Sequence, residues 1–96
     1  MGTEGRTDLT SEKWTPWINE VCAQLGVEPA LVDVPLVHDL TKNIAHRYDR
    51  PMAPVGSYIM GIALGAALAS DPSAEPAELL KDFAAKIETT LPPQSN

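Results

Sequence analysis

Apolar residues recur every three or four positions along much of the chain, which is the spacing of an amphipathic α-helix. The first such helix is predicted over about residues 11–25. Its apolar positions are Trp14, Trp17, Ile18, Val21, Cys22 and Leu25. Pro16 lies either in the first turn of this helix, with Thr15 as the N-cap, or inside a longer helix that it kinks. Gly26 is the predicted C′ residue that ends the helix.

A second amphipathic helix is predicted over residues 34–49, after a single helical turn that begins at Pro29. Asp33 is the expected N-cap of this helix. The arc that faces the core holds Leu36, Val37, Leu40, Thr41, Ile44 and Tyr48. Arg47 falls inside the same arc, so its guanidinium must either extend outward to water or meet a carboxylate.

The third predicted helix, residues 55–69, follows a proline-rich connector and is apolar on every side. A helix without a polar face is expected to be enclosed by its neighbours. Gly61 and Gly65, with Ala69 one turn further on, form a ridge of small residues that lets another backbone come close. That backbone belongs either to the same chain or to a second copy, so a homodimer through Gly61 and Gly65 is one expectation.

A fourth amphipathic helix is predicted over residues 75–90, opening at Pro76. The segments 1–9 and 91–96 are expected to be flexible tails. No run of residues alternates in the manner of a β-strand, and no internal repeat is present. The pattern therefore predicts a single all-α domain over residues 1–96, a small four-helix bundle in which three amphipathic helices surround a central apolar helix.

Residues 51–70 contain no formal charge, which raises the question of a membrane span. The continuous apolar part, residues 59–69, covers only about 16 Å at the rise of an α-helix. The hydrocarbon core of a bilayer is about 30 Å thick. We therefore expect a buried helix of a soluble protein and no membrane association. The N-terminal residues are polar and lack the apolar segment of a secretory signal, so no secretory signal is expected.

The chain of 96 residues carries 13 acidic and 7 basic side chains, for a formal net charge of −6. A general nucleic-acid-binding protein would show a basic patch or stripe, so no nucleic-acid partner is expected. Cys22 is the single cysteine. An intramolecular disulfide is therefore excluded, and the composition fits a reducing compartment.

The residues that could carry catalysis or bind a metal are too far apart to act together. His38 and His46 lie about 12 Å apart along one helix, whereas two ligands of one zinc ion must converge on it. Asp39 and His46 are separated by about 10 Å along the same axis, beyond hydrogen-bond reach. Ser57 is not set in a nucleophile elbow. We predict no catalytic residue, no metal site and no cofactor.

The connection between the second and third helices is the one locally positive stretch, with three cations against two carboxylates in residues 38–50. We expect it to bind a protein partner or a ligand. The candidate residues are Asp39, Asn43, His46, Arg50, Gly56 and Ser57. For an anionic ligand, Arg50 and His46 would act together with the backbone N–H groups of Gly56 and Ser57 at a helix N-terminus.

Several short motifs between about residues 14 and 70 resemble a bacterial family of uncharacterised small helical domains. They are Trp17…Leu25-Gly26-Val27, Ala30-Leu31-Val32-Asp33, Asp39-Leu40, Ala45-His46, Arg50-Pro51-x-Ala53-Pro54-Val55 and Gly61-Ile62-Ala63-x-Gly65. Domains of that family occur alone and at the C-terminus of molybdenum cofactor guanylyltransferases. The resemblance implies a cytoplasmic accessory module linked to molybdenum-cofactor (molybdopterin-guanine dinucleotide) biosynthesis. It does not imply guanylyl transfer, which requires a nucleotide-binding α/β domain.

The leading functional expectation is a non-catalytic interaction module that binds a protein partner, with molybdenum-cofactor enzymes as the candidates. Two alternatives stay open at this point. The first is a small domain that binds an anionic ligand at the connection between the second and third helices. The second is a structural unit that oligomerises through the third helix.

Overall fold

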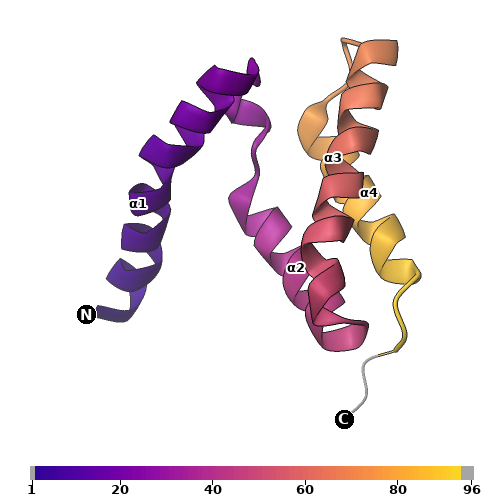
Figure 1. The fold of residues 1–96 in the computed structure, drawn as a ribbon, viewed down its shortest axis with the longest axis horizontal. Helices are drawn as coiled ribbons and strands as arrows, with labels where there is room; N and C mark the ends of the chain where they lie inside the picture. The colour runs from indigo at the N-terminus through magenta and orange to yellow at the C-terminus, as the bar shows by residue number, and fades with distance from the viewer. Residues whose placement is uncertain (1, 94–96) are drawn as a thin grey trace. The chain divides into compact units, whose positions relative to one another are not determined.

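The structure of the chain is a computed structural model that describes residues 2–93, with side chains from residue 12 onwards. Four α-helices account for most of it: α1 (Gly2–Leu25), α2 (Val34–Arg47), α3 (Ala53–Ser70) and α4 (Pro76–Thr89) (Figure 1). Two short 3-10 turns, η1 (Pro29–Leu31) and η2 (Arg50–Met52), lie between them. No strand occurs in residues 2–93, so the predicted all-α class is confirmed. The chain divides into two compact units, Met1–Val32 and Asp33–Asn96.

In the first unit, α1 begins at Gly2, well before the predicted start at residue 11. Residues 2–9 of the expected flexible tail are therefore helical, and residue 1 lies outside the described residues. The flexibility of this segment stays a prediction. Pro16 lies inside the helix, which is the second of the two alternatives. A proline removes one backbone donor from the helix. Residues 2–15 contain no proline, so no missing backbone N–H interrupts the helix before Pro16.

The end of α1 follows the prediction. Gly26 has a positive φ of 70°, which a residue without a Cβ adopts at little cost. The N–H of Val27 donates to the carbonyl oxygen of Cys22 at 2.9 Å, which is the longer hydrogen bond of a Schellman C-cap. Cys22 is buried, as expected for a small apolar residue. Trp17, predicted on the same apolar face, is 69% exposed.

The second unit begins with the predicted N-cap, where Asp33 Oδ1 accepts a hydrogen bond from the N–H of Leu36 at 3.1 Å. The helix α2 ends at Arg47, two residues before the predicted end. The N–H groups of Tyr48 and Asp49 both donate to the carbonyl oxygen of Ile44, at 2.9 and 3.0 Å. Pro51 has no N–H to donate to the carbonyl oxygen of Arg47, so α2 does not continue through it. The chain instead turns through η2 and starts α3 at Ala53.

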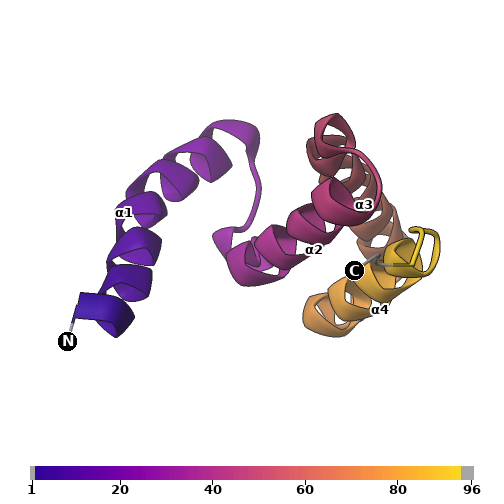
Figure 2. The ribbon, with the colours of Figure 1, turned by 90° about the horizontal axis from the view of Figure 1, so that it is seen from below.

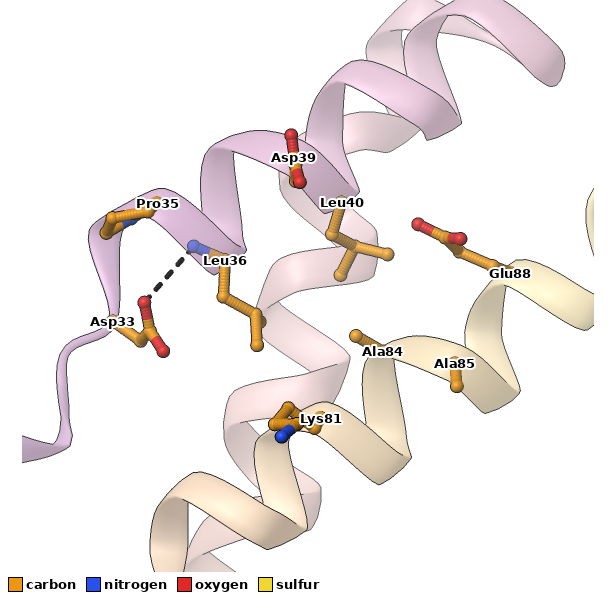
Figure 3. Close-up of a pocket in the computed structure, with 9 residues that line it drawn as sticks. All are labelled: Asp33, Pro35, Leu36, Asp39, Leu40, Lys81, Ala84, Ala85 and Glu88. Atoms are coloured by element: carbon orange, nitrogen blue, oxygen red, sulfur yellow. Dashed lines mark hydrogen bonds between the residues drawn. The ribbon is translucent and has the colours of Figure 1, made fainter. Parts of the chain in front are cut away.

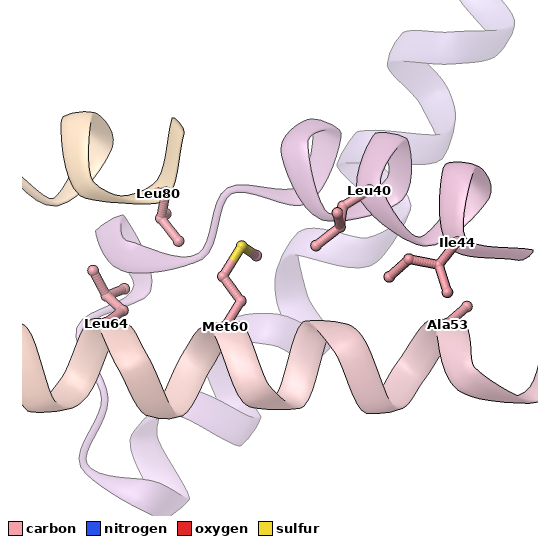
Figure 4. Close-up of a cluster of buried hydrophobic side chains, with 6 residues drawn as sticks. All are labelled: Leu40, Ile44, Ala53, Met60, Leu64 and Leu80. Atoms are coloured by element: carbon pink, nitrogen blue, oxygen red, sulfur yellow. The ribbon is translucent and has the colours of Figure 1, made fainter. Parts of the chain in front are cut away.

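The core of the second unit lies where α2, α3 and α4 pack against one another, and both ribbon views show these helices side by side (Figures 1 and 2). Its buried residues are Leu40, Ile44, Ala53, Met60, Leu64 and Leu80. Leu40 is fully buried. Figure 4 shows Met60 and Leu64 pointing from one side of α3 toward the residues of α2 and α4. The helix α3 is thus the one that contributes most residues to this core.

Polar contacts join α2 to the end of α4. The Nδ2 of Asn43 donates to Glu88 Oε2 at 2.6 Å. The guanidinium of Arg47 donates from Nε to the carbonyl oxygen of Pro92 at 3.0 Å, and from Nη2 to the carbonyl oxygens of Glu88 and Leu91 at 3.4 Å each. The acceptors of Arg47 among the described residues are thus backbone carbonyl oxygens, and no carboxylate is one of them.

The C-terminal tail was expected to begin at residue 91. The structure shows that Leu91 packs against the core and that the Pro92 carbonyl accepts the hydrogen bond from Arg47. The first residues of the predicted tail are therefore held to the fold by long-range contacts. Residues 94–96 of the same tail lie outside the described part of the chain.

Candidate functional site

One side of α3 is exposed along the whole length of the helix and carries no charge. The exposed residues are Pro54, Val55, Tyr58, Ile59, Gly61, Ile62, Gly65, Ala66, Ala69 and Ser70, and we call this set the α3 face. At the rise of an α-helix, the α3 face is about 24 Å long. An uncharged strip of this length is unusual on the surface of a protein that otherwise carries many acidic side chains.

Large apolar side chains are concentrated at the start of this strip. Tyr58 is 70% exposed, and Ile59 and Ile62 are each 55% exposed. Six of the ten exposed large apolar residues in the described part of the chain lie between Tyr48 and Ile62. Exposed apolar patches of this kind mark sites of contact with other molecules, and tyrosine is enriched in such contacts.

The expected enclosure of residues 55–69 by neighbouring helices is only partly right. The side of α3 that holds Met60 and Leu64 packs on α2 and α4, as predicted, whereas the α3 face is exposed. The stretch Arg50–Ser70 is also the one helix among the described residues that is long and apolar enough to cross a membrane. It meets this condition by length and composition alone. Met60 and Leu64 pack on α2 and α4, and 17% of the apolar stretch is buried inside the protein.

The glycines of α3 have two different environments. A Cβ added at Gly61 or Gly65 would meet nothing within 4 Å, so the predicted ridge of small residues has open space above it. A Cβ added at Gly56 would collide with the Cδ1 methyl group of Ile44. The close approach of two helices within the unit therefore occurs at Gly56, where α2 and α3 meet, and not at the glycines for which it was expected.

Two shallow hollows between α3 and α4 continue the α3 face. Their volumes are about 310 and 210 Å³, and both are lined by Gly56, Ile59, Ile87 and Thr90. The smaller one is also lined by Tyr48, Met52 and Val55. Tyr48 was predicted to face the core, but its side chain is 65% exposed. Gly56 was among the predicted site residues. Tyr48, Met52, Val55 and Ile59 were not, although the absence of charge in residues 51–70 was a signal for the last three.

The structure does not gather the six predicted site residues into one pocket. Asp39, His46 and Arg50 are exposed, and no hydrogen bond or ion pair of their side chains occurs within the described residues. Asn43 is held by Glu88. The hydroxyl of Ser57 donates to the carbonyl oxygen of Pro54 at 2.9 Å, within the first turn of α3.

The backbone groups proposed for an anion are also differently placed. Since α3 begins at Ala53, Gly56 and Ser57 are its fourth and fifth residues. Only the N–H groups of the N-cap and the first three residues of an α-helix lack an intrahelical acceptor. The N–H groups of Gly56 and Ser57 therefore lie beyond the part of the helix that could hold an anion. The anion site stays a prediction that rests on Arg50 and His46.

A separate hollow of about 480 Å³ lies between α2 and α4 (Figure 3). Leu36 and Leu40 point into it from α2, and Lys81 and Glu88 come from α4. Of its three carboxylates, Asp33 caps α2 and Glu88 accepts the hydrogen bond from Asn43, so these two have a role in the fold. The third is Asp39, one of the predicted site residues, which is exposed. The described residues contain no group of three or more His, Cys, Asp or Glu side chains that could hold a metal ion.

Comparisons with known proteins give one match. The family described as "Domain of unknown function (DUF6457)" matches residues 9–94, a range that includes α2, α3, α4 and most of α1. The match therefore spans parts of both compact units. No curated protein and no solved structure matches the chain.

Proposed function

The chain belongs to the DUF6457 family of domains of unknown function, and from this premise we propose that it is a non-catalytic module that binds another protein through the α3 face. The observation that carries the proposal is the exposure of ten residues of α3, none of them charged. Burying apolar surface releases about 25 cal/mol per Å². Covering the strip with a partner therefore lowers the free energy of the system.

The shape of the surface favours a protein over a small molecule. Pockets for small ligands are concave and enclose most of the ligand. The α3 face is instead a strip about 24 Å long on the outside of a helix, continued by hollows that are shallow. Tyr58, Ile59 and Ile62 project from its first half and its midpoint, and tyrosine is among the residues that contribute most to the binding energy of interfaces.

The exposed polar residues that precede α3 fit the same proposal as the edge of an interface. His46 and Arg50 lie just before the α3 face in the sequence and have no side-chain partner within the described residues. The rim of a protein interface is polar and accessible to water. In this role, His46 and Arg50 would select the partner rather than supply most of the affinity.

The partner that we propose comes from the resemblance of the sequence to domains associated with molybdenum cofactor guanylyltransferases. On that ground, the module works in the cytoplasm and binds enzymes that make or carry the molybdopterin-guanine dinucleotide cofactor. The exposed α3 face supports an interaction role. The identity of the partner rests on the resemblance alone.

A photo-crosslinking amino acid at position 58 tests the proposal in cells. The matched control places the same amino acid at Glu78, an exposed residue of α4 outside the α3 face. We expect protein adducts from position 58 that position 78 does not form, with molybdenum-cofactor enzymes among those identified by mass spectrometry. Equal adducts from both positions, or none from position 58, would contradict the binding role of the α3 face.

A further inference from the structure

We propose that the α3 face binds the α3 face of a second copy of this chain, with the two helices antiparallel and the two-fold axis near Ile62. This inference rests on the proposed function, because it names a second partner for the same surface. A second copy and a different protein would occupy the α3 face in turn. Three observations carry the inference: the absence of charge, the order of large and small residues along the strip, and the open space at two glycines.

The absence of charge suits contact between identical surfaces. In a two-fold dimer, each patch meets the same patch of the other copy. A charge near the axis of such an interface would therefore face a charge of the same sign. The chain has a net charge of −6, yet the α3 face contains no charged residue along its whole length. Two copies can therefore meet at the α3 face without the repulsion between like charges that other surfaces of this acidic protein would produce.

The order of side-chain sizes selects the antiparallel arrangement. The first half of the α3 face has large side chains, such as Tyr58 and Ile59. The second half has small residues, such as Gly65 and Ala66. An axis at Ile62 places residues of one copy opposite residues of the other whose numbers add to 124. Tyr58 then faces Ala66, and Ile59 faces Gly65.

The next layer outward repeats the relation between large and small residues, because Val55 faces Ala69. A parallel pair would instead place Tyr58 against Tyr58 and Gly65 against Gly65. The first contact would be crowded and the second would leave a gap, and both depart from the close packing of protein interfaces. Apart from Ile62, which meets Ile62 of the other copy at the axis, the antiparallel pair lets the large side chains enter the space above small ones.

The glycines supply that space. Nothing lies within 4 Å of a Cβ added at Gly61 or Gly65, so the atoms of the protomer itself do not fill the positions above them. Glycine inside a helix costs about 1 kcal/mol relative to alanine. The close approach of a second helix to the backbone would explain why glycine, with its low helix propensity, occupies the exposed positions Gly61 and Gly65.

The dimer should be reversible. The α3 face offers ten residues a side, fewer than the 20–30 or so of a standard stable interface. We therefore expect the full chain to dimerise at high protein concentration and to dissociate on dilution. Sedimentation equilibrium over a range of loading concentrations measures this mass directly.

Charge substitution at the axis tests the position of the interface. Ile62→Glu and Ile62→Lys each bring two like charges together across the axis, so each variant alone should be monomeric at every concentration. An equimolar mixture of the two should sediment as a heterodimer, because the carboxylate introduced in one copy then meets the ammonium group introduced in the other. Circular dichroism should show unchanged helicity, since the side chain of Ile62 is 55% exposed.

An exchange of sizes tests the direction of the helices. Gly65→Leu fills the space opposite Ile59 of the other copy and should abolish dimerisation without a change in helicity. Adding Ile59→Ala to Gly65→Leu should restore the dimer, because the large and small positions have exchanged places. In a parallel pair, the leucines introduced in the two copies would meet each other, and the second substitution would bring no recovery.

The outcomes separate this inference from the proposed function. A wild-type chain that stays monomeric at every concentration overturns the second copy as partner, and so does a dimer that Ile62→Glu leaves intact. Adducts from position 58 to a different protein would then keep the proposed function. Binding of the wild-type chain to phosphatidylglycerol vesicles that is lost in Ile62→Glu would assign the α3 face to lipid and overturn both.

Discussion

The Nε of Arg47 in α2 donates to the carbonyl oxygen of Pro92 at 3.0 Å, across 45 residues of sequence. Its Nη2 reaches the carbonyl oxygens of Glu88 and Leu91, each at 3.4 Å. The last carbonyls of a helix lack intrahelical donors and carry a partial negative charge. A guanidinium from α2 therefore caps α4 and holds the residues that follow it.

Arg47→Met removes these three hydrogen bonds and keeps most of the apolar side chain. We expect the free energy of unfolding to fall by about 1–3 kcal/mol, since hydrogen bonds from a charged donor are stronger than neutral ones. Urea denaturation followed by circular dichroism measures the change. Lys42→Met is the matched control, because Lys42 is an exposed cation of the same helix, and it should change stability by no more than about 0.5 kcal/mol.

The hydrogen bond between Asn43 and Glu88 predicts a measurable coupling between these two side chains. At 2.6 Å and partly buried, it joins a neutral donor to a carboxylate. In a double-mutant cycle with Asn43→Ala and Glu88→Ala, the coupling energy should be about 1 kcal/mol. The same cycle with Glu78→Ala in place of Glu88→Ala should give a coupling near zero. Equal couplings in the two cycles would show that the bond adds nothing to stability.

Two alanine substitutions in α3 should have different effects on stability. Gly61→Ala places a methyl group in open space and should raise the free energy of unfolding by about 0.5–1 kcal/mol, measured at low protein concentration. Gly56→Ala makes the same gain in helix propensity but forces the Cδ1 methyl of buried Ile44 out of its place. Shifting a side chain off its rotamer costs about 0.5–1.5 kcal/mol. We expect Gly56→Ala to be about 1 kcal/mol less stable than Gly61→Ala.

Truncation of apolar side chains should separate the core from the α3 face. Leu40 is fully buried among α2, α3 and α4, so Leu40→Ala should lower the free energy of unfolding by about 2–5 kcal/mol. Ile59→Ala removes a side chain that is 55% exposed, and at concentrations where the chain is monomeric it should change stability by less than about 1 kcal/mol. A large loss for Ile59→Ala in the monomer would show that another part of the chain covers this residue.

The features that sequence reasoning predicted correctly depend on neighbours within a few residues. Asp33 caps α2, Gly26 ends α1 with a positive φ, and Pro76 opens α4. Each follows from the hydrogen-bonding or torsional properties of one side chain at one backbone position. No tertiary contact is needed to specify them.

Helix ends were predicted less well, and one of them changed the placement of a residue. The second helix was expected to continue to residue 49, which placed Tyr48 on the core-facing arc. Since α2 ends at Arg47, Tyr48 leaves the helical register and its side chain becomes exposed. Helix ends depend on one or two hydrogen bonds, so alternatives of nearly equal free energy compete there.

The candidate site was predicted least well from the local sequence. Asn43 was predicted to bind a partner, but its amide is held by Glu88, 45 residues away. No residue near Asn43 in the sequence indicates that contact. The α3 face was missed for the opposite reason, because a helix that is apolar all round predicts burial on every side.

Apart from residues 2–10, the sequence by itself determined which segments are helical. It also determined that the third of the four α-helices carries no charge on any side. It did not determine which side of that helix faces the protein, because a helix that is apolar all round has no period to mark its inner side. Only the packing of α2 and α4 decided that Met60 and Leu64 are buried while Ile59 and Ile62 are exposed. The surface on which the proposed function rests is therefore a product of tertiary structure.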